Sequence, residues 1–395
     1  MDKVGQLLKL IATCAAGLEA VLARELESLG YKDLQVENGR VVFTAGLRDI
    51  AKANIWLRTA GRVLVLMGAF PALTFDELFE GTKALAWADW LPPDAEFPVS
   101  GRARNSKLMS VPDCQAIVKK AIVESLKGRY RRRWFEETGA RFPIDVSLNG
   151  DIATLTIDTS GTGLHKRGYR PEAGTAPLRE TLAAGLVLLS YWQPDRVLLD
   201  PCCGAGTIPI EAALIGLNKA PGLERDFAPA AWPVVPKKVW EEEREEAKAC
   251  IRHEELRIYG SDIDGEAVRL ARRNAEKAGV GGAVHWQTLP LSQVRSRYQY
   301  GCLICNPPYG ERIGDREASE SLYIELGKVA RQLENWSIYV LTNHPGFERF
   351  FGRRADRRRK LYNGRLETTY YQFFGPRPGA AHTLAQAHAH AHKKE

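Results

Sequence analysis

Residues 196–207 read RVLLDPCCGAGT, an apolar run that ends in Asp200, followed by a Gly-x-Gly turn and the apolar stretch Ile208–Ile215. Glycine adopts backbone angles that other residues avoid and lets a ligand approach the main chain. A helix that begins at such a turn also presents unpaired N–H groups. The segment therefore predicts a strand, a ligand-binding turn and a helix, although a plain tight turn would give the same short pattern.

The turn departs from two common phosphate-binding patterns. No Gly-Lys-Ser/Thr follows it, which excludes a P-loop, and Pro209 stands in place of the third glycine of the dinucleotide fingerprint. Around it, helical stretches alternate with short apolar runs at 197–199, 258–260, 301–305 and 337–341. This alternation predicts an α/β domain with a parallel, doubly wound sheet.

A carboxylate pair follows the second of these runs, at Asp262-Ile263-Asp264. An acidic residue at the carboxyl end of the second strand is placed to hold a ribose diol. It lies much farther from the glycines than the roughly 20 residues of a dinucleotide fold, so the intervening proline-rich and acidic segment is interpreted as an insertion. Either carboxylate could instead cap the helix predicted from Gly265 to Ala278, and the two could divide these roles.

The most specific motif is the apolar run 302–305 that leads directly into Asn306-Pro307-Pro308-Tyr309. An exocyclic amine on a nucleobase is a poor nucleophile until acceptors localise its lone pair, and the Asn306 side-chain oxygen and the Pro307 carbonyl can accept from it. The prolines fix the backbone and add no competing N–H donor. Tyr309 offers a ring on which an extruded base can stack. Methyl transfer from a sulfonium needs mainly positioning, so no strong base is required.

The N-terminal half has a different pattern. Residues 1–70 read as βαββαβ, with Asn38-Gly39 between two short apolar runs, which is typical of a hairpin in a ferredoxin-like unit. Residues 71–160 add helices at 75–86 and 112–126, a strand near 97–101 and a second hairpin across Asn149-Gly150-Asp151. The Gly-rich basic segment from Ser160 to Gly174 is interpreted as a linker, and the Ala/His-rich residues 377–395 as a disordered tail.

Composition limits the class of protein. The 395 residues are 45% hydrophobic, carry a net charge of +7 and contain seven cysteines. This is enough material for two or three folded domains. The longest late apolar run, Leu182–Trp192, is too short for a membrane span, and the N-terminus lacks the pattern of a signal peptide. An odd number of scattered cysteines favours reduced thiols in the cytoplasm.

Taken together, the motifs at 200–207, 260–264 and 306–312 resemble motifs I, II and IV of class I S-adenosylmethionine-dependent methyltransferases that act on base amines. The segments at 176–184, 220–227 and 361–367 are similar to bacterial THUMP-domain RNA methyltransferases, including the enzyme half that makes N2-methylguanosine in large-subunit ribosomal RNA. The resemblance covers nearly the whole chain. It implies a ferredoxin-like domain (1–70) and a THUMP domain (71–160), an α+β module, before a Rossmann-like catalytic domain (161–376).

The resemblance also implies roles for individual residues. Asp200, Gly204 and Gly206 would border the methionine part of S-adenosylmethionine, with Cys202 and Thr207 beside them. Asp262 would bind the ribose hydroxyls next to Ile263, and Asn306, Pro307, Pro308 and Tyr309 would surround the target amine, Asn306 also bordering the cofactor. One position departs from the family. Where an acidic residue usually contacts adenine, residues 286–291 read WQTLPL, so a backbone group or Gln287 is expected to substitute.

Basic residues cluster at 127–133, which include Arg131, Arg132 and Arg133, at 353–360, and more loosely at Arg102, Arg104 and Lys107. A charge run is often only a solvated face. Beside a base-modifying motif, with Tyr130 and Trp134 nearby, these runs are interpreted as RNA phosphate contacts. Cys302 and Cys305 are interpreted as structural, because residues three apart on a strand face opposite sides, and no metal site is expected.

The sequence therefore predicts an enzyme that methylates an exocyclic amine in RNA, with guanine N2 in 23S ribosomal RNA as the preferred target. N2-methylation of transfer RNA is the first alternative. N6-methylation of DNA adenine is the second, because Asn-Pro-Pro-Tyr serves both amines. A non-catalytic RNA-binding assembly factor is the third. No membrane partner is expected, and the sequence leaves the oligomeric state open.

Overall fold

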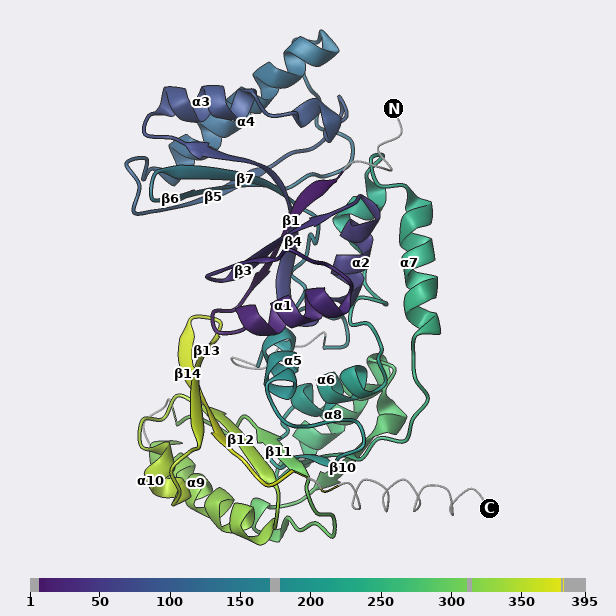
Figure 1. The fold of residues 1–395 in the computed structure, drawn as a ribbon, viewed down its shortest axis with the longest axis vertical. Coiled ribbons are helices and arrows are strands. Elements are labelled where there is room, and N and C mark those ends of the chain that lie inside the picture. The colour runs from purple at the N-terminus through teal and green to yellow at the C-terminus, as the bar shows by residue number, and fades with distance from the viewer. Residues whose placement is uncertain (1–6, 171–177, 311–314, 378, 380–395) are drawn as a thin grey trace. The chain divides into compact units, whose positions relative to one another are not determined.

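The computed structural model describes residues 7–170, 178–310, 315–377 and 379 (Figure 1). The chain divides into two compact units. The first comprises the described residues up to Cys14, Leu22–Leu164 and Gly222–Ala249; the second comprises Ala15–Val21, His165–Pro221 and the described residues from Cys250 onward. Among the described residues, no helix has the length and apolarity needed to cross a membrane.

The first unit begins with the predicted βαββαβ order. Strands β1 (Leu8–Cys14), β2 (Gln35–Glu37), β3 (Arg40–Ala45) and β4 (Ala60–Pro71) form the sheet order β2-β3-β1-β4, and helices α1 (Glu19–Ser28) and α2 (Arg48–Trp56) connect them. Glu37 pairs with Arg40 across Asn38-Gly39, and Gly39 has φ of +74°. The hairpin and the ferredoxin-like topology predicted from the sequence are confirmed.

The following segment supplies α3 (Phe75–Lys83), the short turn η1 (Trp87–Asp89), β5 (Val99–Arg104), α4 (Val111–Tyr130), β6 (Ile144–Asn149) and β7 (Ile152–Asp158). The hairpin across Asn149-Gly150-Asp151 is confirmed, since Asn149 pairs with Ile152. β7 also pairs antiparallel with β4. The two N-terminal segments therefore share one seven-stranded sheet, β2-β3-β1-β4-β7-β6-β5, which the sequence did not predict.

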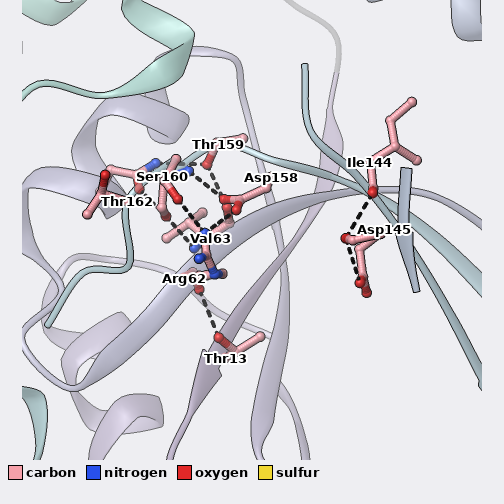
Figure 2. Close-up of polar contacts among 12 residues, drawn as sticks. Thr13, Arg62, Val63, Ile144, Asp145, Asp158, Thr159, Ser160 and Thr162 are labelled. Atoms are coloured by element: carbon pink, nitrogen blue, oxygen red, sulfur yellow. Dashed lines mark hydrogen bonds and ion pairs between the residues drawn. The ribbon is translucent and has the colours of Figure 1, made fainter. Parts of the chain in front are cut away.

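Hydrogen bonds and an ion pair connect the end of β7 and the two residues after it to β4 (Figure 2). The Val63 N–H donates to Ser160 Oγ at 2.8 Å, while Thr159 donates to the Val63 carbonyl through both its N–H and its hydroxyl. Arg62 forms an ion pair with Asp158. Val63, Thr159 and Ser160 are buried or nearly so, so these bonds stabilise the point at which the shared sheet ends.

Residues 222–249 pack with this unit although they lie between the two cofactor motifs in sequence. They contain the short turn η2 (Ala228–Ala231) and α7 (Lys237–Ala249), and Figure 1 shows α7 alongside α2. Arg48 of α2 pairs with Glu243 and Glu246 of α7. Trp232 stacks on Phe142 with ring centres 4.4 Å apart. The segment interpreted as an insertion is thus an integral part of the N-terminal unit.

The second unit is built on the sheet β10-β9-β8-β11-β12-β14-β13. Its strands are β8 (Leu198–Asp200), β9 (Ile258–Asp262), β10 (Val284–Thr288), β11 (Cys302–Cys305), β12 (Ser337–Thr342), β13 (Arg357–Asn363) and β14 (Leu366–Phe373). Its helices are α5 (Glu180–Leu188), α6 (Thr207–Gly216), α8 (Gly265–Lys277), α9 (Asp315–Gln332) and α10 (Phe347–Phe351), with turns η3 (Gly281–Ala283) and η4 (Leu291–Gln293). The five strands β8 to β12 run parallel, as predicted.

The predicted parallel sheet continues at one edge into two antiparallel strands that the sequence did not predict. β14 pairs antiparallel with β12, and β13 pairs antiparallel with β14. The β13–β14 turn has the sequence Asn363-Gly364-Arg365, and Gly364 has φ of +67°. Residues 357–363 carry three arginines and a lysine, so the sequence did not predict a strand there. This strand lies at the edge of the sheet and is exposed to solvent along much of its length.

The segment 160–174, interpreted as a linker, is packed against the protein in its described part. Leu164, Arg167 and Tyr169 are all buried. The unit boundary does fall there, between Leu164 and His165, but the chain beyond it is packed into the second unit. Residues 171–174 of that segment, and residues 378 and 380–395 of the tail predicted to be disordered, lie outside the described residues.

Candidate active site

The Gly-rich turn joins β8 to α6 as expected. Gly204 and Gly206 have φ of +49° and +83°, values that side-chain-bearing residues rarely adopt. Gly204 has open space where a Cβ would stand, whereas a Cβ on Gly206 would come within 2.6 Å of the Trp286 ring. Gly204 thus leaves room for a ligand, and Gly206 lets α6 pack against the sheet.

Neighbouring strands hold this turn in shape. The Cys203 N–H donates to the Ser261 carbonyl of β9 at 2.9 Å, and the buried Asn274 of α8 donates to the Ala205 carbonyl at 3.0 Å. Asp200, at the end of β8, accepts from the Cys202 N–H at 3.2 Å. Burial raises the pKa of the Asp200 carboxyl well above its ordinary value, and the nearby Asp262 raises it further. A carboxylate kept in such surroundings is typical of a functional site.

Of the two carboxylates after β9, one caps the following helix, which is one of the roles considered from the sequence. Asp264 caps α8, accepting from the Glu266 N–H at 2.8 Å. Asp262 accepts from the Gly204 N–H at 2.9 Å with one oxygen and from the Asp264 N–H at 3.0 Å with the other. Asp262 therefore connects the end of β9 to the Gly-rich turn. Ile263, between the two, is 74% exposed, an unusual state for so large an apolar side chain.

Asn306-Pro307-Pro308-Tyr309 follows β11, whose four residues are buried, Cys302 and Cys305 as free thiols. Asn306 and Tyr309 are partly exposed, and the Tyr309 hydroxyl donates a hydrogen bond to Asn306 Oδ1. Behind the loop, the buried Tyr323 of α9 donates to the Pro308 carbonyl at 2.9 Å and lies 3.0 Å from Thr342 Oγ1 at the end of β12. Burial raises the pKa of Tyr323 to about 12, so it stays protonated as a donor.

A small cavity of about 170 Å³ brings the two motifs together. Of the cofactor residues predicted from the sequence, Asp200, Cys202, Gly204, Thr207 and Asn306 line it. Gly206 and Asp262 do not line the cavity but shape the same turn, Gly206 by packing against Trp286 and Asp262 by its hydrogen bond from the Gly204 N–H. Ile263 also lies outside the lining. The meeting of Asn306 with the Gly-rich turn is the relationship that the parallel sheet order predicts for residues at the carboxyl ends of adjacent strands.

Arg170, which the sequence did not predict as a site residue, also lines this cavity. Its guanidinium donates to Thr207 Oγ1 and to the Leu178 carbonyl, each at 3.1 Å, and pairs with Glu180 at 3.1 Å. Both charged side chains are almost completely buried. In the sequence, Arg170 is only a charged residue within a segment interpreted as a linker. Sequence spacing alone does not show that this segment folds back onto α6.

The predicted RNA-binding residues lie in the first unit. Arg102, Arg104 and Lys107 are exposed on and just after β5, with Arg102 paired to Asp145 at 2.9 Å. Arg131, Arg132 and Arg133 are exposed at the end of α4, and Trp134 beside them is 78% exposed. Within the described residues, none of these three arginines forms an ion pair. By contrast, in the 353–360 run Arg353, Arg358 and Lys360 each pair with a carboxylate.

This sheet order, with a Gly-rich turn after the first strand and Asn-Pro-Pro-Tyr after the fourth, defines a class I methyltransferase. The model of the RMKL-like methyltransferase domain matches residues 167–372, a THUMP domain matches 72–158, and the RlmL ferredoxin-like domain matches 9–64. The chain thus belongs to the RMKL-like family of RNA methyltransferases, with a THUMP domain.

Individual relatives support this assignment. YpsC of Bacillus subtilis, named as a candidate RNA methyltransferase, is 48% identical over 92% of this chain and 95% of its own. A Listeria monocytogenes structure described as a predicted N6-adenine-specific DNA methylase is 51% identical, with a TM-score of 0.90 over 94% of this chain and 97% of its own. The structure of SMU.472, a methyltransferase complexed with SAH, is 46% identical, with a TM-score of 0.90 over 95% and 100% of the two chains.

The residues present fit S-adenosylmethionine, the cofactor of this class. Its methionine end is a zwitterion, and the cavity has a cation, Arg170, and a carboxylate, Asp200, in its lining. The open space at Gly204 admits the ligand against the backbone. Asp262 stands at the end of β9, where a ribose is held in folds of this kind. The cofactor assignment therefore agrees with the chemistry of the site.

Proposed function

We propose that this protein methylates the exocyclic N2 of a guanosine in 23S ribosomal RNA. The observation that carries the proposal is the presence of Asn306 in the same cavity as the Gly-rich turn, because an acceptor for the target amine must lie beside the methyl donor. The resemblance of residues 176–184, 220–227 and 361–367 to an enzyme that modifies large-subunit ribosomal RNA supports that substrate.

In this account the residues of Asn306–Tyr309 position an extruded base. Asn306 Oδ1 and the Pro307 carbonyl accept the two N–H bonds of the amine, which directs the nitrogen lone pair toward the cavity. Tyr309 stacks on the base. Tyr323 holds the Pro308 carbonyl and so fixes the loop. S-adenosylmethionine supplies the methyl group from its sulfonium.

With S-adenosylmethionine bound, transfer would form the bond from nitrogen to the methyl carbon as the carbon–sulfur bond breaks, and the amine would lose one proton to water. Asp200 and Arg170 would bind the two charges of the methionine end, and Asp262 would bind the ribose hydroxyls. Cys202, Gly204 and Thr207 would border the methionine, and Ile263 would offer an exposed apolar surface to the adenine. A backbone group would complete the adenine contact, because Gln287 lines a separate cavity together with His285 of the same strand. Phosphates of the RNA bind Arg102, Arg104, Lys107, Arg131, Arg132 and Arg133.

The name of the Listeria relative favours a second candidate, N6-methylation of DNA adenine, since the same acceptors suit that amine. Transfer RNA is a third substrate that a THUMP domain suits. Purified protein and S-adenosylmethionine should be incubated with 23S ribosomal RNA and transfer RNA from cells lacking this gene, and with duplex DNA. Nucleoside mass spectrometry should find new N2-methylguanosine in the ribosomal RNA alone. New N6-methyladenosine, or its deoxy form, would assign the other amine.

A further inference from the structure

One face of the C-terminal sheet is incompletely covered beside β9 and β10. β10 and β11 are joined by residues 289–301, in which the regular element is the three-residue turn η4 rather than a full helix. A cavity of about 270 Å³ lies there, lined in part by Tyr259, Ser261, His285 and Tyr298. All of its lining residues belong to the second unit.

This cavity lies on the opposite face from the cofactor site. A Cβ on Gly260 would meet Trp286 and Pro209 of α6, so Gly260 faces α6. Successive residues of a strand point to opposite faces, so Tyr259 and Ser261 point away from α6 while Asp262, bonded to the Gly-rich turn, points toward it. The cleft and the cofactor cavity thus share strand β9 but open on different sides of it.

Flat side chains form the wall of the cleft. The rings of Tyr259 and His285 stack with centres 5.1 Å apart and planes inclined by 25°, and Tyr298 lies 6.5 Å from Tyr259. The guanidinium groups of Arg257 and Arg297 lie 5.3 and 5.2 Å from the centre of the Tyr298 ring. Aromatic rings and guanidinium planes are the surfaces on which unpaired nucleobases stack in RNA-binding proteins.

The polar groups of the cleft suit an anionic ligand that carries hydrogen-bonding groups. Arg295 and Arg297 line it, both exposed, and the described lining contains no carboxylate. Ser261 is 3% exposed and, in the described structure, its hydroxyl has no hydrogen-bond partner. Buried hydroxyls nearly always have a partner, so this one is available to a ligand in the cleft.

We propose that this cleft binds a nucleotide of the same RNA strand that carries the target base. The base stacks against the rings of Tyr259, His285 and Tyr298, and the phosphate binds Arg295 and Arg297. The inference rests on the proposed RNA methyltransferase function and adds a second RNA-binding surface on the catalytic unit, separate from the N-terminal basic residues. It would favour substrates with unpaired nucleotides beside the target.

The test compares two full-length double variants. Arg295→Glu with Arg297→Glu reverses two charges in the cleft, and Arg272→Glu with Arg273→Glu makes the same change in net charge on the exposed side of α8. Affinity for 23S ribosomal RNA transcribed in vitro should fall about tenfold or more in the cleft variant, with a shallower salt dependence. S-adenosylmethionine affinity, measured by calorimetry, should stay unchanged in both variants.

Three results would overturn the inference: unchanged RNA affinity in the cleft variant, an equal loss in the α8 variant, or a selective loss of S-adenosylmethionine affinity, which would assign the cleft to the cofactor's adenosine. His285→Ala, at an exposed position of edge strand β10, supplies a second measurement without charge reversal, and RNA affinity should fall several-fold because a stacking surface is removed. If the wild-type protein binds and methylates RNA and these variants do so equally well, the proposed role of the cleft is refuted and the proposed function stands. Wild-type protein that neither binds nor methylates RNA would refute the proposed function itself.

Discussion

The hydroxyl of Tyr309 donates a hydrogen bond to the side-chain oxygen of Asn306. We propose that the same oxygen accepts from the target amine. A carbonyl oxygen has two lone pairs, so Asn306 can accept from the amine and from Tyr309 together, although the two donors compete for it. The hydrogen bond to Asn306 and the stacking proposed for the ring are therefore separable roles of Tyr309.

Tyr309→Phe and Tyr309→Ala separate the two roles of this side chain. Phenylalanine keeps the ring and removes the competing donor, so kcat/KM for RNA should stay within a few-fold of wild type or rise. Alanine removes the stacking surface, worth about 1–3 kcal/mol, and should lower kcat/KM roughly 5- to 150-fold. Steady-state methylation kinetics check both. Equal, large losses in the two variants would show that the hydroxyl itself takes part in the reaction.

Asn306→Ala should nearly abolish methyl transfer while largely preserving cofactor affinity, because the substrate amine is the proposed main partner of this side chain. The loss of one positioned polar group at a reacting centre typically costs about 10²–10³ in rate. Single-turnover rates and calorimetric titration with S-adenosylmethionine measure the two effects separately. A comparable loss of cofactor affinity would contradict the role given to Asn306.

Asp200→Asn should stabilise the protein and weaken cofactor binding. The raised pKa of Asp200 means that the folded state favours the protonated carboxyl, so the ionised form costs stability, and that cost grows as the pH rises above the unfolded pKa. The amide removes the cost at neutral pH, and melting temperature should rise by a few degrees. Affinity for S-adenosylmethionine should fall about tenfold or more, because the ammonium of the bound cofactor would favour the ionised form of Asp200 and an amide cannot supply that charge. A lower melting temperature would contradict this account of Asp200.

Arg170→Gln combined with Glu180→Gln tests the proposed interaction with the cofactor carboxylate. Removing only Arg170 would leave Glu180 buried without its cation, a change that often costs about 3–5 kcal/mol of stability. The double variant avoids that charge, so it should fold and yet bind S-adenosylmethionine at least about tenfold more weakly. Circular dichroism and calorimetry check the two parts. Full cofactor affinity in a folded double variant would limit Arg170 to a structural role.

Arg131, Arg132 and Arg133 changed together to Ala should weaken RNA binding and reduce its salt dependence, by about 0.7 in slope for each single-strand phosphate that the variant no longer binds. The matched control changes Lys237, Lys238 and Lys248 of α7, each paired to a glutamate on the same helix. Filter binding across a salt series measures the slopes. If the salt dependence of RNA affinity is unchanged in the arginine variant, these three arginines form only a solvated face and do not bind phosphates.

Much of the architecture could be predicted because its signals are local. The Asn38-Gly39 and Asn149–Asp151 hairpins, the Gly-rich turn and the strand before Asn306 each depend on a few adjacent residues, and parallel strand order brings Asp200 and Asn306 together. What the sequence missed is long-range. The β4–β7 pairing, the packing of α7 on α2 and the hydrogen bond from Arg170 to Thr207 join residues separated by loops whose paths no local pattern encodes.

The basic, edge-lying β13 shows a different reason for failure. Arg357 to Lys360 read as a charge run because an exposed edge strand needs few apolar residues, so period-two alternation was absent from most of its length. At the site, Tyr323 was missed for the same reason as Arg170: its bond to Pro308 depends on the path of α9 relative to the sheet, which sequence spacing does not give.

The most direct test of the central claim is nucleoside mass spectrometry of ribosomal and transfer RNA from cells with and without this gene, followed by restoration in vitro with purified protein. The account predicts that N2-methylguanosine in 23S ribosomal RNA falls in the deletion strain and returns when wild-type protein and S-adenosylmethionine are added. The Asn306→Ala variant should not restore it. An unchanged set of methylated nucleosides in every RNA pool would contradict the account.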